Sequence, residues 1–251
     1  MNATLESIRR AGAPHGLNLV AATPVERYEA AITKGIRARE LAPDARSIVI
    51  IGNGGGDLWA VLKRHTVANP GWMDREHPLD DFTRATVESS IAAPLRETGH
   101  RCTVVYPFMG DGRTLNFMEL AKIAGLAGPS IIGVAVHPVF GPWIAFRAAL
   151  LIDELIDAPG PAASFDPCPT CIPRSCIAAC PVSAVSLAGG WDIPKCLTHR
   201  VEVEPDCAAR CHARVACVLG PQHVYPDDEL TYHQMRALRP MQRWYEANVR
   251  K

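Results

Sequence analysis

The sequence predicts an α+β or α/β sheet domain followed by a small cysteine-rich module, on three observations. Before residue 158, short apolar runs of strand length alternate with segments of helical periodicity. Of the nine cysteines, only Cys102 lies before Cys168, and the other eight end at Cys217. Residues 158–167, at the border, are rich in proline, glycine and alanine, a composition typical of linkers.

The elements of the sheet domain can be read in order. A first helix is predicted over 25–41, where Tyr28, Ile32 and Ile36 recur on one face. The β-branched run 47–52 predicts a buried strand. Asp57 is a candidate cap for the helix that follows. Further helices are expected at 57–66, 80–98, 115–124 and 227–249 (interrupted at Pro240), and further strands at 102–106, 131–136 and 148–152.

Composition narrows the function classes. Hydrophobic residues make up 48% and charged residues 21% of the 251 residues, an ordinary globular balance. The formal net charge is zero, which disfavours nucleic acid and anionic membranes as partners. Residues 1–16 are amphipathic and of mixed charge, and no apolar run is long enough to span a bilayer. We therefore expect a cytoplasmic protein, whose cysteines are metal ligands rather than disulfides.

The cysteine spacing points to iron–sulfur clusters. Cys176-x3-Cys180-Pro181 is the ending of the bacterial ferredoxin run, in which the last cysteine ligates the other cluster of the pair. Transferred here, that rule predicts two [4Fe–4S] clusters, with the following ligands. The first would be held by Cys168, Cys171, Cys176 and Cys217, and the second by Cys180, Cys196, Cys207 and Cys211.

Two alternatives to this assignment stay open. The spacing departs from the ferredoxin norm, with two extra residues between Cys171 and Cys176 and a valine after Cys217. Structural zinc, held by the knuckles Cys168/Cys171 and Cys207/Cys211, is one alternative, and a site of incomplete occupancy is the other. Cys102, alone in an apolar run, is expected to be a core residue.

Two family resemblances extend this interpretation. The segment Ala124-Gly-Leu…His137-Pro-Val-Phe-Gly-Pro-Trp143 resembles epoxyqueuosine reductases, which are cobalamin-dependent and carry a two-cluster ferredoxin module. This resemblance places Asp111 at the catalytic acid and His137 at a strand-end histidine, whereas Ser130-Ile131 replaces the Gly-Lys of that family. The string 136–147 and the tail 221–232 resemble CblC-type cobalamin-processing proteins, although Val224 replaces an arginine of their tail motif.

Both families share a nitroreductase-like fold that binds cobalamin, so the resemblance implies a domain plan. We expect a nitroreductase-like corrinoid-binding domain over 1–160, a ferredoxin-like iron–sulfur module over 161–220, and a helical tail over 221–251 that packs on the first domain. The fold class is then α+β. FMN, which this fold also binds, is the alternative to cobalamin.

Several residues are candidates for contact with the corrinoid. His137 either approaches the corrin or is a structural histidine, and Phe140 and Trp143 are either a flat wall or core aromatics. Arg147 either meets a propionamide or phosphate or forms a surface ion pair.

Two loops are further candidates. Gly54 and Gly55, in a glycine-rich turn between strand and helix, form either a phosphate cradle or a tight turn. Asp111, between glycines, is either a proton donor or a turn residue.

The expected function is reduction of the corrinoid cobalt and removal of its upper ligand, with electrons delivered by a reductase or ferredoxin through the clusters. One rival is an epoxyqueuosine reductase-like enzyme acting on tRNA, with Asp111 as acid. The other is a non-enzymatic corrinoid carrier with structural zinc.

Overall fold

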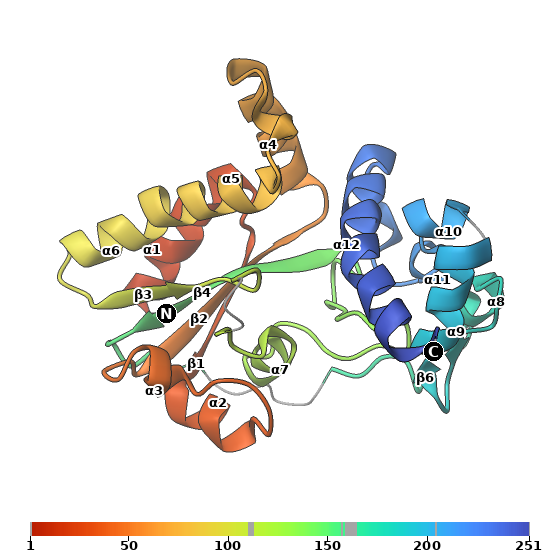
Figure 1. Cartoon of the computed structure of the whole chain (residues 1–251). Coiled ribbons are helices and arrows are strands. Elements are labelled where there is room, and N and C mark those ends of the chain that lie inside the picture. The colour runs from red at the N-terminus through yellow and green to blue at the C-terminus, as the bar shows by residue number, and fades with distance from the viewer. Residues whose placement is uncertain (1, 110–112, 157, 159–164, 204, 251) are drawn as a thin grey trace. The chain divides into compact units, whose positions relative to one another are not determined.

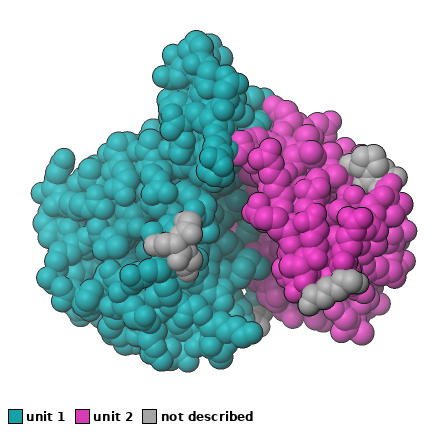
Figure 2. Space-filling model, in the orientation of Figure 1, with its two compact units in different colours: residues 1–127, 144–165 teal, residues 128–143, 166–251 magenta. Residues whose placement is uncertain are grey.

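The computed structural model describes residues 2–109, 113–156, 158, 165–203 and 205–250, and they form two compact units. The first unit comprises Met1–Ala127 and Ile144–Phe165, and the second comprises Gly128–Trp143 and Asp166–Lys251 (Figure 2). This grouping differs from the predicted boundaries, because the segment 128–143 and the tail 221–251 both fall in the unit that contains the clustered cysteines.

The first unit is built on one antiparallel sheet with the strand order β1-β2-β4-β3. The strands are β1 (Leu19–Pro24), β2 (Ser47–Gly54), β3 (Cys102–Val105) and β4 (Ile144–Ile152). Every residue of β2 is buried, and its pairing with β4 shifts register between Ile51 and Gly52. The apolar run 47–52 thus forms a central strand, and the predicted α+β class is confirmed.

Helices cover both faces of this sheet. Figure 1 shows α1, α5 and α6 over one face and α2, α3 and α7 over the other. The helices of the first unit are α1 (Ala3–Gly12), η1 (Ala13–His15), α2 (Val25–Ala31), α3 (Ala38–Leu41), α4 (Asp57–Ala68), η2 (Trp72–Asp74), α5 (Pro78–Val87), the π-helical turn η3 (Glu88–Ala92), α6 (Ala93–Glu97) and α7 (Phe117–Ile123). Because both faces are covered, β2 carries a continuous apolar run rather than an alternating pattern.

Cys102 lies in the core of this unit, as its sequence context predicted. Cys102 is the first residue of β3 and is 9% exposed. Burial raises the pKa of the Cys102 thiol to about 11. The thiol is therefore protonated at neutral pH and behaves as a small apolar side chain.

The second unit is helical, with one small hairpin. Its elements are α8 (Ser175–Ala179), β5 (Val185–Ser186), β6 (Gly190–Trp191), α9 (Ile193–Thr198), the π-helical turn η4 (His199–Val203), α10 (Pro205–Ala209), α11 (His212–Val215), η5 (Pro221–His223) and α12 (Asp227–Asn248). The long helix α12 packs against α9 and α10. Among the described residues, no helix is both long enough and apolar enough to cross a membrane.

Three predictions about elements were wrong. The run 131–136 is a turn, because Gly133 adopts a left-handed conformation with the Trp191 ring against it. The helix predicted over 25–41 breaks after Ala31, where Ile32 is extended and Gly35 has a φ of 103°. The helix α12 continues through Pro240. In addition, α1 and β1 were not predicted from the sequence.

Candidate metal centres

Two cavities in the second unit are each lined by four cysteines. One cavity, of about 180 Å³, is lined by Cys180, Cys196, Cys207 and Cys211, and is called the Cys180 cavity below. The other, of about 190 Å³, is lined by Cys168, Cys171, Cys176 and Cys217, and is called the Cys168 cavity. The structure thus brings together the same two sets of cysteines that the ferredoxin rule predicts.

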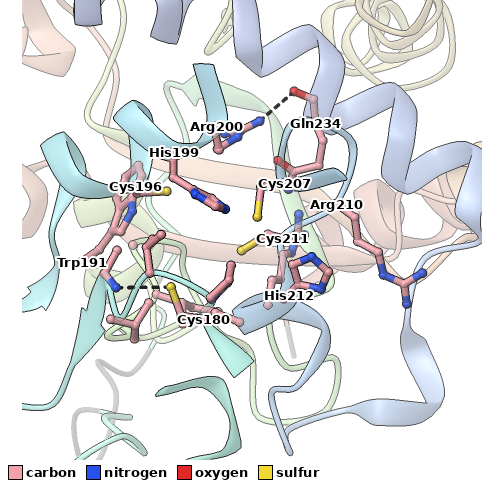
Figure 3. A pocket seen from close by; sticks show the side chains of 18 of the residues that line it. Cys180, Trp191, Cys196, His199, Arg200, Cys207, Arg210, Cys211, His212 and Gln234 are labelled. Atoms are coloured by element: carbon pink, nitrogen blue, oxygen red, sulfur yellow. Dashed lines mark hydrogen bonds between the residues drawn. The ribbon is translucent and has the colours of Figure 1, made fainter. Parts of the chain in front are cut away.

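Short helices bring the thiols of the Cys180 cavity together (Figure 3). Cys180 is the C-cap of α8, and the following Pro181 cannot continue the helix. Cys196 and Cys207 lie within α9 and α10, and Cys211 is the N-cap of α11. The backbone N–H of Ala184 donates a hydrogen bond to Cys180 Sγ over 3.3 Å. The four cysteines of the cavity therefore come from the ends or the interior of four short helices, α8, α9, α10 and α11.

The Cys168 cavity takes its fourth cysteine from a distant part of the chain. Cys168 and Cys171 lie before α8, Cys176 lies within it, and Cys217 follows α11. Arg174, in a left-handed conformation with φ 47°, donates from Nε to the Cys171 carbonyl over 3.2 Å, which fixes the turn into α8. Because α8 runs between the two cavities, Cys176 lines one and Cys180 lines the other.

The pKa shifts of the thiols separate the cysteines into the same two sets. The pKa of Cys207 is raised to about 11, mainly by burial and in addition by the neighbouring Cys211, Cys196, Asp206 and Cys180. Burial also raises the pKa of Cys217, and of the other cysteines it is Cys168 and Cys171 that add to the effect. Bound cations reverse this penalty, because they stabilise the thiolate form.

These donors fit an iron–sulfur cluster in each cavity, because thiolate sulfur is the usual ligand of such clusters. Within the described residues, no three His, Cys, Asp or Glu side chains form a group that could hold a single metal ion.

A pair of glycines holds the segment after Cys217 in place. Gly141 has a φ of 57°, and a Cβ added there would collide with the Leu219 carbonyl oxygen. Gly220 has a φ of 60°, and its added Cβ would lie 2.5 Å from the carbonyl carbon of Phe140. The backbone at 140–141 therefore packs directly on 219–220, which positions Cys217 nearby.

This close packing predicts a specific effect of Gly141→Ala. We expect the variant to lose about 1–3 kcal/mol of stability and to bind less iron, because Leu219 must move and carries Cys217 with it. The matched control is Gly190→Ala, since Gly190 has a similar φ of 65° but no atom within 4 Å of the added Cβ. Thermal unfolding and iron content of both variants are the measurements. Equal losses in the two variants would contradict the role of the close packing.

His137 and Phe140 lie on a turn with partly exposed rings. The backbone N–H groups of Val139 and Phe140 donate to His137 Nδ1 over 3.0 and 3.3 Å. Burial, and then the nearby His223, lower the pKa of His137, so the ring is neutral with its proton on Nε2. His137 therefore offers one N–H donor beside the Phe140 ring, a pairing that fits a flat ligand with acceptors on its rim.

Trp143 and Arg147 are both more buried than their expected roles require. Trp143 is 0% exposed and packs edge-on against Tyr225, with the Arg214 guanidinium 4.8 Å from its ring centre. This favours a core role over a wall for the corrin. Arg147 is 6% exposed and donates from Nε to Asn53 Oδ1 over 2.6 Å, so its side chain lies inside the first unit rather than on the surface.

Both backbone polar groups of Gly54, in the glycine-rich turn, have hydrogen-bond partners. The N–H of Gly54 donates to Asn18 Oδ1 over 2.7 Å, and its carbonyl accepts from Asn18 Nδ2. Gly55 has a φ of 68°, as a tight turn requires. This geometry favours the turn over a phosphate cradle. Asp111, the predicted acid, lies outside the described residues.

Sequence reasoning missed the basic residues that line the Cys180 cavity. Arg200 and Arg214 are among its lining residues, and neither was singled out. His199 also lines the cavity, with its ring between Cys196 and Cys207 (Figure 3). The signal that could have found His199 and Arg200 is their spacing, since they follow Cys196 by three and four residues and helical spacing places them on the same face.

No protein-family model matches the chain, and no curated protein matches its sequence. Solved structures do match. The B12-trafficking protein CblC of C. elegans is 13% identical, with a TM-score of 0.56 over 95% of this chain and 97% of that one. Epoxyqueuosine reductase from Streptococcus thermophilus is 13% identical, with a TM-score of 0.51 over 90% of this chain and 68% of that one. The chain shares their fold.

A third similar structure extends the comparison. A catabolic reductive dehalogenase, solved with 3-bromo-4-hydroxybenzoic acid, is 16% identical, with a TM-score of 0.55 over 96% of this chain and 35% of that one. The chain therefore spans about a third of the dehalogenase but nearly all of CblC. The similarity to CblC and to epoxyqueuosine reductase confirms the two resemblances seen in the sequence, at the level of the fold.

Proposed function

We propose that the protein is a corrinoid-binding redox protein that carries two [4Fe–4S] clusters. The observation that supports this most strongly is the crossed arrangement of the ligands, in which Cys180 joins the later cysteines and Cys217 joins the earlier ones. In two-cluster ferredoxins the last cysteine of the run likewise ligates the other cluster. The Cys168 set and the Cys180 set would each hold one cluster.

The size of the cavities and a buried charge favour clusters over zinc. A zinc ion sits about 2.3 Å from each thiolate sulfur, so it needs far less space than the roughly 180 Å³ of the Cys180 cavity. Arg200, 9% exposed, also lines this cavity, and no carboxylate pairs with it among the described residues. A cluster with four thiolates carries net negative charge, which would compensate the buried guanidinium.

The corrinoid part of the proposal rests on the resemblance of 136–147 to CblC-type proteins and on the fold shared with a B12-trafficking protein. Bound cobalamin would supply a cobalt ion that accepts single electrons. The Nε2–H of His137 would donate a hydrogen bond to an amide on the corrin rim, and Phe140 would pack against its face. Asp111 remains the proposed proton donor.

The proposed reaction is reductive removal of the upper ligand, with electrons arriving one at a time from a reductase or ferredoxin. Iron–sulfur clusters suit this role, because each cluster gains or loses one electron at a time. The protein would then act as an oxidoreductase in cobalamin processing.

Titration with hydroxocobalamin tests the corrinoid proposal. Protein purified without oxygen should shift the visible corrin bands, and His137→Ala should weaken binding by roughly tenfold, since a hydrogen bond to a neutral partner contributes about 1 kcal/mol and ring contact adds to it. His15→Ala, in the first unit, is the control. Iron-containing protein without any corrin response would refute corrinoid binding, and a response to FMN instead would identify a flavin protein.

A further inference from the structure

The two cysteine cavities differ in the charge of their walls. The Cys180 cavity is lined by His199, Arg200, Arg210, His212 and Arg214 in addition to its cysteines. The Cys168 cavity has Arg174 as its charged lining residue, and the rest of its wall apart from the cysteines is Ser175 with proline and aliphatic side chains. Clusters placed in these two cavities would therefore experience different electrostatic surroundings.

Arg200 is the most deeply buried of these basic residues. Its guanidinium donates to the Met241 sulfur over 2.8 Å and to the carbonyls of Ala208 and Gln234, each over 3.2 Å (Figure 3 shows the last of these). These partners are all neutral, and the buried Nε has no hydrogen-bond partner among the described residues. Arg200 thus brings an uncompensated positive charge to the cavity wall, held in place by α10 and α12.

His199 provides a hydrogen-bond donor at the same wall. It begins the π-helical turn η4, a departure from α-helix that often occurs at functional sites. Its Nε2 is buried and has no hydrogen-bond partner within the described part of the chain. Figure 3 shows its ring between the Cys196 and Cys207 side chains, directed into the cavity. A sulfur atom of a cluster bound in the cavity would be the acceptor for a hydrogen bond from this nitrogen.

The remaining basic residues contribute less to the difference. Arg210 pairs with Asp227 over 3.4 Å, and His212 Nε2 lies 2.9 Å from an Asp206 carboxylate oxygen, so each has a carboxylate beside it. Arg174, on the other cavity, is exposed and its Nε is bound to the Cys171 carbonyl, so water screens its charge. Arg214 is half-buried, and its guanidinium donates to the Pro142 carbonyl over 2.6 Å and lies over the Trp143 ring. The asymmetry therefore depends on His199 and Arg200, and Arg214 adds positive charge to the same wall.

The geometry points to a directional electron path, in which the cluster of the Cys180 cavity has the higher reduction potential because His199 and Arg200 stabilise its reduced form. This inference rests on the proposed pair of clusters. Positive charge and hydrogen bonds to cluster sulfur raise the potential, since reduction adds one negative charge to the cluster. One electron would pass from the reduced cluster of the Cys168 cavity to the oxidised cluster of the Cys180 cavity, with no proton transferred.

A redox titration followed by electron paramagnetic resonance tests this inference on the intact iron-loaded protein. We expect two one-electron steps, and a Cys211→Ser variant should identify the higher step as the Cys180-cavity cluster. His199→Phe and Arg200→Met should each lower that step by about tenfold in the reduction equilibrium, equivalent to about 59 mV, and leave the other step unchanged. His199→Gln, which keeps an N–H donor, should restore much of the difference.

Arg174→Met is the matched control, because it removes the charged residue from the other cavity wall. It should move neither step appreciably. The inference is refuted when protein with about eight irons per chain titrates in one step, when the Cys180-cavity cluster is the lower step, or when His199→Phe and Arg200→Met both leave the titration unchanged. Protein that binds zinc and no iron would instead refute the proposed function itself.

Discussion

Replacing Cys180 with serine is expected to remove the same cluster as replacing Cys207, although Cys180 is closer in sequence to Cys176. Cys180 and Cys207 line one cavity, whereas Cys176 lines the other. Losing one thiolate ligand of a cluster should reduce the iron content from about eight to about four per chain and abolish one of two resonance signals. Iron analysis and electron paramagnetic resonance of reduced protein are the measurements.

The complementary variants make this prediction specific. Cys217→Ser and Cys176→Ser should abolish the other signal, since both residues line the Cys168 cavity. Cys102→Ala is the control, because Cys102 lies in the core of the first unit and should leave both signals intact. Loss of a common signal in the Cys180 and Cys176 variants would contradict the crossed arrangement.

Trp143→Ala is expected to have the largest effect on stability. Trp143 is fully buried, forms a core cluster with Tyr225 and Leu230, and stacks with the Arg214 guanidinium. Removing a buried tryptophan side chain costs about 3–5 kcal/mol, because apolar burial is lost and a cavity remains. Denaturant unfolding of the second unit, followed by circular dichroism, should show the loss, and Trp143→Phe should recover much of it.

The same pair of variants separates a core role from contact with a corrin. With Trp143 in the core, Trp143→Phe should retain the corrin spectral response while it loses some stability. Unchanged stability together with a lost corrin response in Trp143→Phe would show that Trp143 contacts the ligand instead.

The parts of the fold that could be predicted from the sequence are those determined by neighbouring residues. The run 47–52 predicts a buried strand because its β-branched residues are consecutive, and β2 extends it only to Gly54. The cysteine grouping followed from the order of the cysteines alone. By contrast, 131–136 is equally apolar but forms a turn, because Gly133 is held against Trp191, a contact that no local pattern reveals.

The failures at the expected ligand-binding residues have the same origin. The backbone N–H of Gly54 is hydrogen-bonded to Asn18, and the Trp143 ring packs against Tyr225. Both partners are distant in sequence from the residue that they contact. Arg200 was overlooked because its burial depends on Gln234 and Met241 of α12, which a single-segment pattern cannot bring together with Cys196. The grouping of the cysteines into two cavities could therefore be predicted, whereas the other residues that line those cavities could not.

The most direct test of the two-cluster proposal is the content of iron, acid-labile sulfide and zinc in protein purified without oxygen. Two [4Fe–4S] clusters predict about eight irons and about eight sulfides per chain, with no zinc. Zinc at about two per chain without sulfide would contradict the proposal and identify the cysteine cavities as structural metal sites.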